Sequence, residues 1–166
     1  MKKLLILACS ALLFATSCLT GGVIPGGSAT YSGSVVVTDT STGEVTYSNK
    51  EAYITVTIPN QEESKFNIVF NKMKFAEAMP KLDVEVPDVP FTPTVSQDET
   101  TINHTFDACN IVPTVGGVKY QKYKIDRIWG CIGKKIDIEF EMLSKQNKVH
   151  FTNVKPDEES TPENQN

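Results

Sequence analysis

The sequence predicts an all-β fold, a small antiparallel up-and-down barrel of about eight strands. From residue 31 onward, apolar and polar residues alternate in short runs. That pattern is typical of strands that bury one face and expose the other. Clusters of turn-forming residues separate the runs, and no stretch has the period of a convincing amphipathic helix. Short strands joined by turns favour a closed barrel or a sandwich.

The first strands are expected at residues 31–38 and 51–58, because every second residue in each of these runs is apolar. The polar segments 39–43 and 59–64 follow them as a turn and a hairpin loop. Each of these strands is therefore expected to bury one face.

The third strand, residues 66–70, ends in a change of phase. Met73 and Phe75 lie at odd spacing from Phe70, and a slip of one residue turns later side chains to the other face of a sheet. The sequence therefore predicts a β-bulge or a bend near Lys72.

Prolines interrupt the middle of the chain. Residues 82–86 alternate between Pro80 and Pro87, so a short strand at an edge or a bend is expected. The other elements expected here are at most one helical turn at 75–79, an extended connection at 89–93, a strand at 102–106, a basic strand at 118–125 and an irregular segment at 127–133.

The clearest hairpin closes the domain. Residues 135–142 alternate strictly between charged and apolar, and residues 148–151 alternate again after a turn at 144–147. The three acids of the first run are in phase with one another and out of phase with the apolar set. A solvated face that pairs with lysines across the sheet is therefore expected, rather than a catalytic carboxylate pair.

The N-terminus has the layout of a secretory signal. Lys2 and Lys3 precede an apolar run at 4–14, and small residues lead from it to Cys18. The apolar run is shorter than the roughly 20 residues that span a bilayer.

Residues 15–18 resemble the lipobox of bacterial lipoproteins, in which the cysteine thiol is diacylated and becomes the first mature residue. Ala15 stands where many lipoboxes have leucine, and the looser boxes of Bacteroides-type bacteria accept it. The resemblance implies a lipid on Cys18 that anchors the chain in the outer membrane of a bacterial cell envelope. No acidic run follows Cys18, which favours the periplasmic face. The alternative is an ordinary secreted protein cut near Ala15.

The chain then divides into four parts: a signal peptide at 1–17, a glycine-rich tether at 18–30, one barrel domain at 31–154 and a disordered acidic tail at 155–166.

The domain also resembles a known family. Residues 31–35, 79–91 and 136–142 with the following hairpin are similar to the calycin-like lipoprotein domains of Bacteroides-type bacteria. The resemblance implies a closed, lipocalin-like barrel, and an eight-stranded barrel either fills with side chains or holds one small ligand. True lipocalins carry Gly-x-Trp on the first strand, whereas Gly33 has no such tryptophan and Trp129 comes late.

The composition excludes several classes of function. Without Lys2 and Lys3, 14 basic residues remain against 20 acidic ones, which disfavours nucleic acid as a partner. We find no catalytic nucleophile motif, no phosphate-binding glycine loop and no metal-ligand spacing. The sequence therefore predicts no enzyme, no cofactor and no metal site.

Cys109 and Cys131 are the candidates for a disulfide, because the envelope permits such bonds. A hairpin of residues 101–106 and 118–125 would instead place them roughly 25 Å apart, and bonded cysteines have Cα atoms within about 7 Å.

His104 shares the phase of Ile102 and Phe106, so it is expected to point into the barrel. There it is either a polar contact for a ligand in an apolar cavity or a histidine of the core. His150 has the phase of Lys148 and is expected to be exposed.

A local basic cluster is the best candidate for a binding surface. It either binds an anionic ligand or a glycan on aromatic faces, or it cancels the charge of the neighbouring acidic strand. Its members are Lys119, Tyr120, Lys122, Tyr123, Lys124, Arg127, Trp129, Lys134 and Lys135.

Two functions remain open. One is a binding protein that holds a small apolar or amphipathic ligand inside its barrel. The other is a non-enzymatic envelope module that docks a protein or a glycan through its outer face, with the interior filled by its own side chains. Fold alone does not decide between them.

Overall fold

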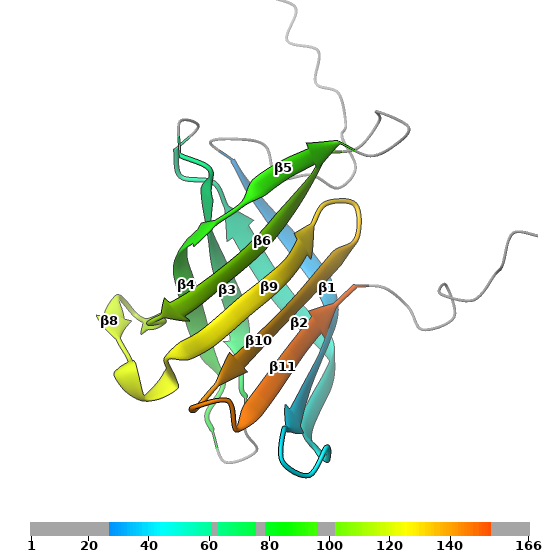
Figure 1. Cartoon of the computed structure of the whole chain (residues 1–166), viewed down its shortest axis with the longest axis vertical. Coiled ribbons are helices and arrows are strands. Elements are labelled where there is room, and N and C mark those ends of the chain that lie inside the picture. Colours follow the sequence, from blue (N-terminus) through cyan, green and yellow to red (C-terminus); the bar gives the residue numbers. More distant parts are fainter. Residues whose placement is uncertain (1–26, 61–62, 76–78, 96–101, 154–166) are drawn as a thin grey trace, which may run out of the picture.

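The computed structural model describes residues 27–60, 63–75, 79–95 and 102–153 (Figure 1). None of these residues lies in a helix that is long and apolar enough to cross a lipid bilayer. The strands are β1 (Ser28–Asp39), β2 (Val45–Thr57), β3 (Lys65–Met73), β4 (Leu82–Pro90), β5 (Thr92–Val95), β6 (Ile102–Ile111), β7 (Thr114–Val115), β8 (Val118–Lys119), β9 (Ile125–Ile132), β10 (Ile136–Met142) and β11 (Asn147–Thr152).

The signal peptide, most of the tether and the acidic tail lie outside the described residues, as do residues 76–78 of the expected helical turn. β1 begins at Ser28, inside the segment expected to be the tether, and not at Tyr31.

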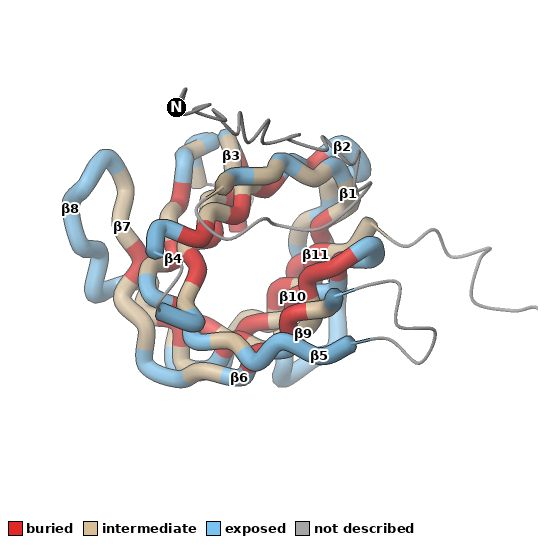
Figure 2. The backbone as a smooth tube through the Cα atoms, turned by 90° about the horizontal axis from the view of Figure 1, so that it is seen from above, coloured by how far each residue is buried: buried red, intermediate tan, exposed pale blue. Residues whose placement is uncertain are grey.

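A single antiparallel sheet contains the eleven strands of the described residues, in the order β5-β6-β9-β10-β11-β1-β2-β3-β4-β7-β8. The sheet curls into a half-barrel (Figures 1 and 2). Its buried residues face the interior, where Phe70 of β3 meets Phe140 of β10 and Phe151 of β11. The predicted all-β, antiparallel class is confirmed. The strand number differs from about eight because β5, β7 and β8, of four, two and two residues, have no period of their own.

The two ends of the sheet approach each other where β4 continues into β5. Only Phe91 separates these strands, yet β4 pairs with β3 and β5 pairs with β6. β4 and β6 consequently lie side by side, and the strands surround a buried interior in Figure 2.

Buried side chains alternate with more exposed ones along the strands. In β10, Ile136, Ile138, Phe140 and Met142 are buried, and the charged residues between them are not. The same alternation holds in β2 beyond Ala52 and in β3. Each buried aliphatic or aromatic side chain stabilises the fold by roughly 1.5–3 kcal/mol relative to exposure. The apolar face of the sheet is therefore what holds the curl together.

The bulge expected near Lys72 is confirmed. The register between β3 and β4 shifts between Phe70 and Met73, and Lys72 itself has a φ of 46°. A second shift lies opposite Pro87 and Asp88, where Asp88 has a φ of 54°. Both bulges bend the pair of strands, which is how a sheet acquires curvature.

The proline-flanked segment is longer than expected, because β4 runs on to Pro90. It pairs with β3 along one side and with β7 at Glu85 and Thr114 on the other. The expected extended connection at 89–93 is thus the end of β4 and the beginning of β5.

The prediction for residues 118–133 places the long strand in the wrong half of this segment. Residues 118–125 hold a two-residue strand and a 3-10 turn, whereas the segment expected to be irregular is most of β9. Two features interrupt the alternating sequence pattern that would identify this strand. A register shift separates Ile125 from Arg127 in the pairing with β10, and glycine stands at the inward position 130.

Gly130 lets β9 lie close to β10. A Cβ atom at this position would lie 2.0 Å from the carbonyl oxygen of Asp137, and the φ of 147° disfavours any side chain. We expect Gly130→Ala to lower the free energy of unfolding by about 3 kcal/mol, because a backbone atom must move.

Gly117→Ala is the matched control, since Gly117 has a φ of 79° and open space around its Cβ position. This variant should lose only about 1–2 kcal/mol of the free energy of unfolding, which is the cost of holding alanine in a left-handed conformation. Urea unfolding followed by tryptophan fluorescence measures both variants, and equal losses would contradict the close approach.

Candidate functional site

The structure distributes His104 and the basic cluster over four places. His104 lies in the interior, Arg127 and Trp129 lie on the outer face of β9, and the cluster members from Lys119 to Lys124 lie just before β9. Lys134 and Lys135 follow the other end of that strand. Because eight residues of strand span about 26 Å, the basic cluster expected from the sequence is not one surface.

Residues 113–124 form a hairpin and a 3-10 turn that we call the flap. β7 pairs with β8 across Gly116 and Gly117, whose φ angles of 57° and 79° suit a tight hairpin turn. Figures 1 and 2 show the flap standing out from the half-barrel. Interpreting 118–125 as one strand misses it, and the Gly-Gly pair is the sequence signal that identifies it.

The flap is attached at its base. Thr114 pairs with Glu85 of β4, and its hydroxyl donates a hydrogen bond of 3.0 Å to the Glu85 carboxylate. The main-chain N–H of Tyr120 donates to the carbonyl of Pro113 at 2.9 Å. β8 lies at the end of the sheet, so its outer edge has no neighbouring strand among the described residues.

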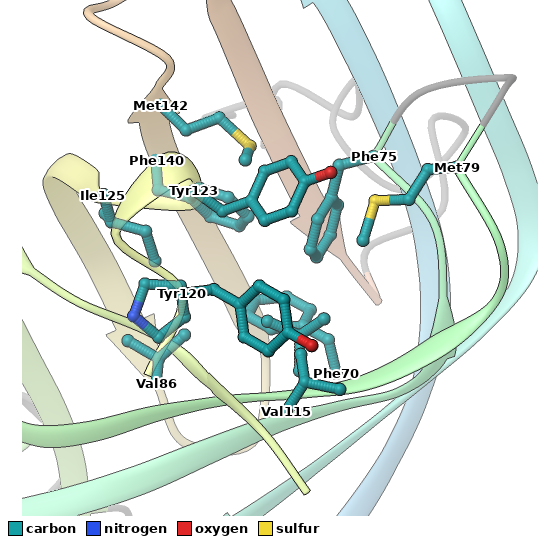
Figure 3. A pocket seen from close by; sticks show the side chains of 12 residues that line it. Phe70, Phe75, Met79, Val86, Val115, Tyr120, Tyr123, Ile125, Phe140 and Met142 are labelled. Atoms are coloured by element: carbon teal, nitrogen blue, oxygen red, sulfur yellow. The ribbon is translucent and has the colours of Figure 1, made fainter. Parts of the chain in front are cut away.

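The 3-10 turn brings two tyrosines together. The N–H of Tyr123 donates to the carbonyl of Tyr120 at 3.0 Å, and the ring centroids lie 6.3 Å apart with planes tilted by 31°. Both rings line a cavity at this end of the half-barrel (Figure 3). The other lining residues are Phe70, Phe75, Met79, Val84, Val86, Pro113, Val115, Ile125, Phe140 and Met142.

This cavity is small. Its free volume is about 10 Å³, which is room for about one water molecule. Its lining is apolar apart from the tyrosine hydroxyls, so the flap covers a packed end of the interior and not an open ligand chamber.

The lysines of the flap are not equivalent. The Lys124 ammonium donates to the side chain of Asn110 at 3.0 Å and lies 3.7 Å from the Asp126 carboxylate. Lys119 and Lys122 are exposed and make no ion pair with any residue that the structure describes. The Lys122 ammonium lies 5.7 Å from the centre of the Tyr123 ring.

Arg127 and Trp129 are engaged within the sheet. Nε and Nη2 of Arg127 donate to the two carboxylate oxygens of Asp107 at 2.9 and 2.6 Å, which lowers the pKa of Asp107. The guanidinium lies 4.9 Å from the Trp129 ring, and Lys148 lies 5.4 Å from it. Lys148 also pairs with Glu139. Arg127 is thus neutralised across the ladder by β6, and not by the acidic strand β10 as the sequence suggested, whereas Glu139 of β10 pairs with Lys148 of β11.

His104 points inward, as its phase predicts, and is only 6% exposed. Its ring meets Phe91 edge to face with centroids 4.6 Å apart, and its Nδ1 atom has no hydrogen-bond partner. Burial lowers the pKa of His104, and a main-chain contact with Ile132 opposes this weakly. His150 is half-buried, and its Nε2 lies 2.5 Å from the Asp137 carboxylate.

Cys109 and Cys131 are both free thiols. Cys131 stands opposite Thr105 in the β6–β9 ladder, four residues before Cys109. That offset corresponds to about 13 Å along the strands, which exceeds the reach of a disulfide. Burial raises the pKa of the Cys131 thiol, and the nearby Asp137 adds to the effect.

The described part of the chain gives no support for a metal site. No three histidine, cysteine, aspartate or glutamate side chains gather there in a way that could hold a metal ion. The lipidation candidate Cys18 lies outside the described residues. Comparison of the chain with protein-family models, curated proteins and solved structures finds no match.

The free thiols predict a labelling order. A maleimide reagent is expected to modify Cys109 at least about tenfold faster than Cys131, because Cys109 is exposed and burial suppresses the Cys131 thiolate. Because the sequence has four cysteines, peptide mass mapping at successive times, without reductant, follows the labelling of Cys109 and Cys131 separately. A chain that gains no label until it is reduced would contradict the structure.

The buried histidine predicts a loss of stability in acid. Because the folded pKa of His104 lies below 6.5, the unfolded chain binds a proton more readily than the folded one. The free energy of unfolding should therefore fall as pH drops from about 6.5 through the folded pKa of His104. His104→Phe should remove this part of the pH dependence.

His150→Gln is the control, since the chain has only two histidines. Urea unfolding between pH 7.5 and 5 compares the three proteins. If His104→Phe keeps the full acid slope of the wild type, the buried neutral state of His104 is refuted.

Proposed function

We propose that this chain is a lipid-anchored, calycin-like protein of a bacterial cell envelope that binds a partner through its outer surface and catalyses no reaction. The observation that carries the proposal is the packing of the interior. Where side chains fill the space that a barrel ligand would occupy, binding has to take place outside.

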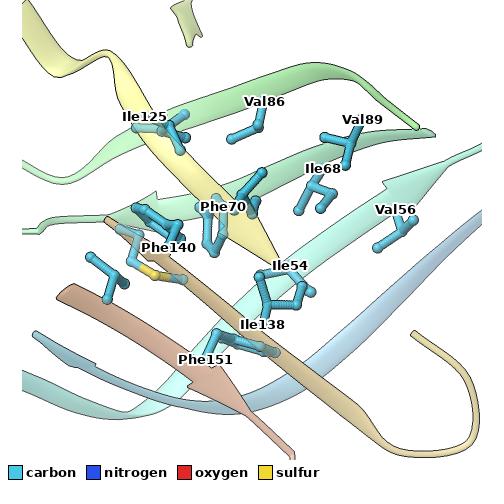
Figure 4. Packing of buried hydrophobic residues seen from close by; sticks show 14 of the residues in the cluster. Ile54, Val56, Ile68, Phe70, Val86, Val89, Ile125, Ile138, Phe140 and Phe151 are labelled. Carbon is cyan, nitrogen blue, oxygen red and sulfur yellow. The ribbon is translucent and has the colours of Figure 1, made fainter. Parts of the chain in front are cut away.

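The interior packing is dense around Phe70. Its ring lies 5.3 Å from that of Phe140 and 5.5 Å from that of Phe75, and Phe151 closes the group at 6.5 Å. Figure 4 shows Phe70, Phe140 and Phe151 and aliphatic side chains converging from several strands. Pockets for small molecules commonly enclose about 300–1,000 Å³, far more than the cavity beside the flap. This supports the docking function over the ligand-carrier function.

The strand arrangement supports the calycin-like part of the proposal. Consecutive long strands pair in order around the half-barrel, and β1 pairs with β11, which joins the first and the last strand of the described residues. Such an up-and-down meander is the connectivity that the resemblance implies.

The start of β1, to which an anchor at Cys18 would lead, and the flap lie at opposite ends of the fold. Ser34, Thr152, Asp137 and Cys131 form one row across β1, β11, β10 and β9. The chain enters β1 on one side of this row, and the flap joins β9 at Ile125 on the other. A lipid on Cys18 would thus leave the flap facing away from the membrane.

Native mass spectrometry of protein purified from its host tests the proposal. We expect a chain that begins at Cys18, carries the mass of acyl chains on that residue and holds no further small molecule. A bound apolar molecule would instead favour the ligand carrier, and an unmodified Cys18 thiol would remove the lipid anchor.

A further inference from the structure

We infer that the flap is a docking surface for an extended acidic segment of another protein. The inference rests on the proposed function, because it names the partner of the outer surface. It starts from three properties that meet in the flap: uncompensated positive charge, exposed apolar side chains and an open strand edge.

The charge is local. Lys119 and Lys122 stand three residues apart without an acidic partner in the described structure, while Asp126 is already engaged by Lys124 and by the main-chain N–H of Lys145. The whole chain has a net charge of −4, so this positive spot is not a property of the surface in general. Complementary charge steers and orients a partner, and here it selects carboxylates.

The apolar contribution comes from Val118 and Tyr120, which are 61% and 40% exposed. They flank Lys119 on the same short stretch. Tyrosine at a rim of charged residues is a common anchor of protein interfaces. A partner that only carried charge would leave these side chains in water.

The open edge of β8 can also orient the partner segment. β8 is paired with β7 on one side and has no strand on the other in the described residues. An extended segment can hydrogen-bond to such an edge and place alternate side chains on its two faces. Since β8 has only two residues, the edge fixes the register, and the side chains supply most of the selectivity.

A glycan fits the flap less well. Stacking of a sugar requires an open, flat aromatic face, and the Tyr123 ring is half-buried against the cavity with the Lys122 ammonium near it. The other large ring, Trp129, is approached by Arg127 and Lys148. Of the rings of Tyr120, Tyr123 and Trp129 only the first is exposed, so the flap offers a sugar a single aromatic platform, which favours a protein segment over a carbohydrate chain.

Fluorescence anisotropy tests the inference with the full protein in detergent. The probe is a fluorescein-labelled peptide of alternating glutamate and valine. We expect saturable binding that weakens with salt. The double variant Lys119→Glu/Lys122→Glu should weaken it at least about tenfold. Val118→Ser, which leaves the charge unchanged, should weaken it about threefold.

The matched control is Lys134→Glu/Lys135→Glu, which makes the same change of charge at the opposite end of β9. Binding should be unaffected. Equal losses in the two double variants, or no binding by the wild type, would overturn the inference. Binding of polygalacturonate but not of the peptide would assign the flap to a glycan and overturn it as well.

The two proposals fail separately. A small molecule found inside the host-purified protein would refute the proposed function without changing the anisotropy. Failure of the peptide to bind would leave the packed interior and the lipid anchor untouched.

Discussion

The fold depends on one constraint: the apolar face of a single sheet has to leave water without a second sheet or a helix to cover it in the described residues. The sheet meets this constraint by curling, so that β3 faces β10 and β11 across the interior and Phe70 reaches Phe140 and Phe151. Bulges near Lys72 and Asp88 supply the bend. The same side chains that stabilise the curl occupy the space where a ligand would lie.

That packing has a consequence for function. A cluster of phenylalanine rings occupies the interior of the half-barrel, and in our proposal the partner therefore binds on the convex face or at one end. On the convex face of β9 the charges are paired with neighbouring strands, as Arg127 is with Asp107. The end that carries the flap is where lysines without an ion pair in the described structure, exposed apolar groups and an open strand edge occur together.

Much of this could be predicted from the sequence, since strict alternation leaves few choices. Residues 135–142 sort into buried and exposed sides as their pattern requires, and the inward phase of His104 is confirmed. Where the series of inward apolar residues is interrupted, the sequence pattern alone could not identify the strand. Gly130 leaves a gap in the apolar series of β9, and the shift near Asp126 breaks its period. Closeness in sequence also misleads, because Lys124 and Lys134 stand beyond opposite ends of one strand.

Xenon binding measures the packed interior most directly. An apolar cavity of about 150 Å³ takes up xenon or benzene, whereas a space for about one water does not. The account predicts that ¹²⁹Xe NMR of the purified protein shows no saturable shift beyond that of the unfolded chain. A saturable xenon site lined by Phe70 and Phe140 would contradict it, because it would reveal an interior chamber with room for a ligand.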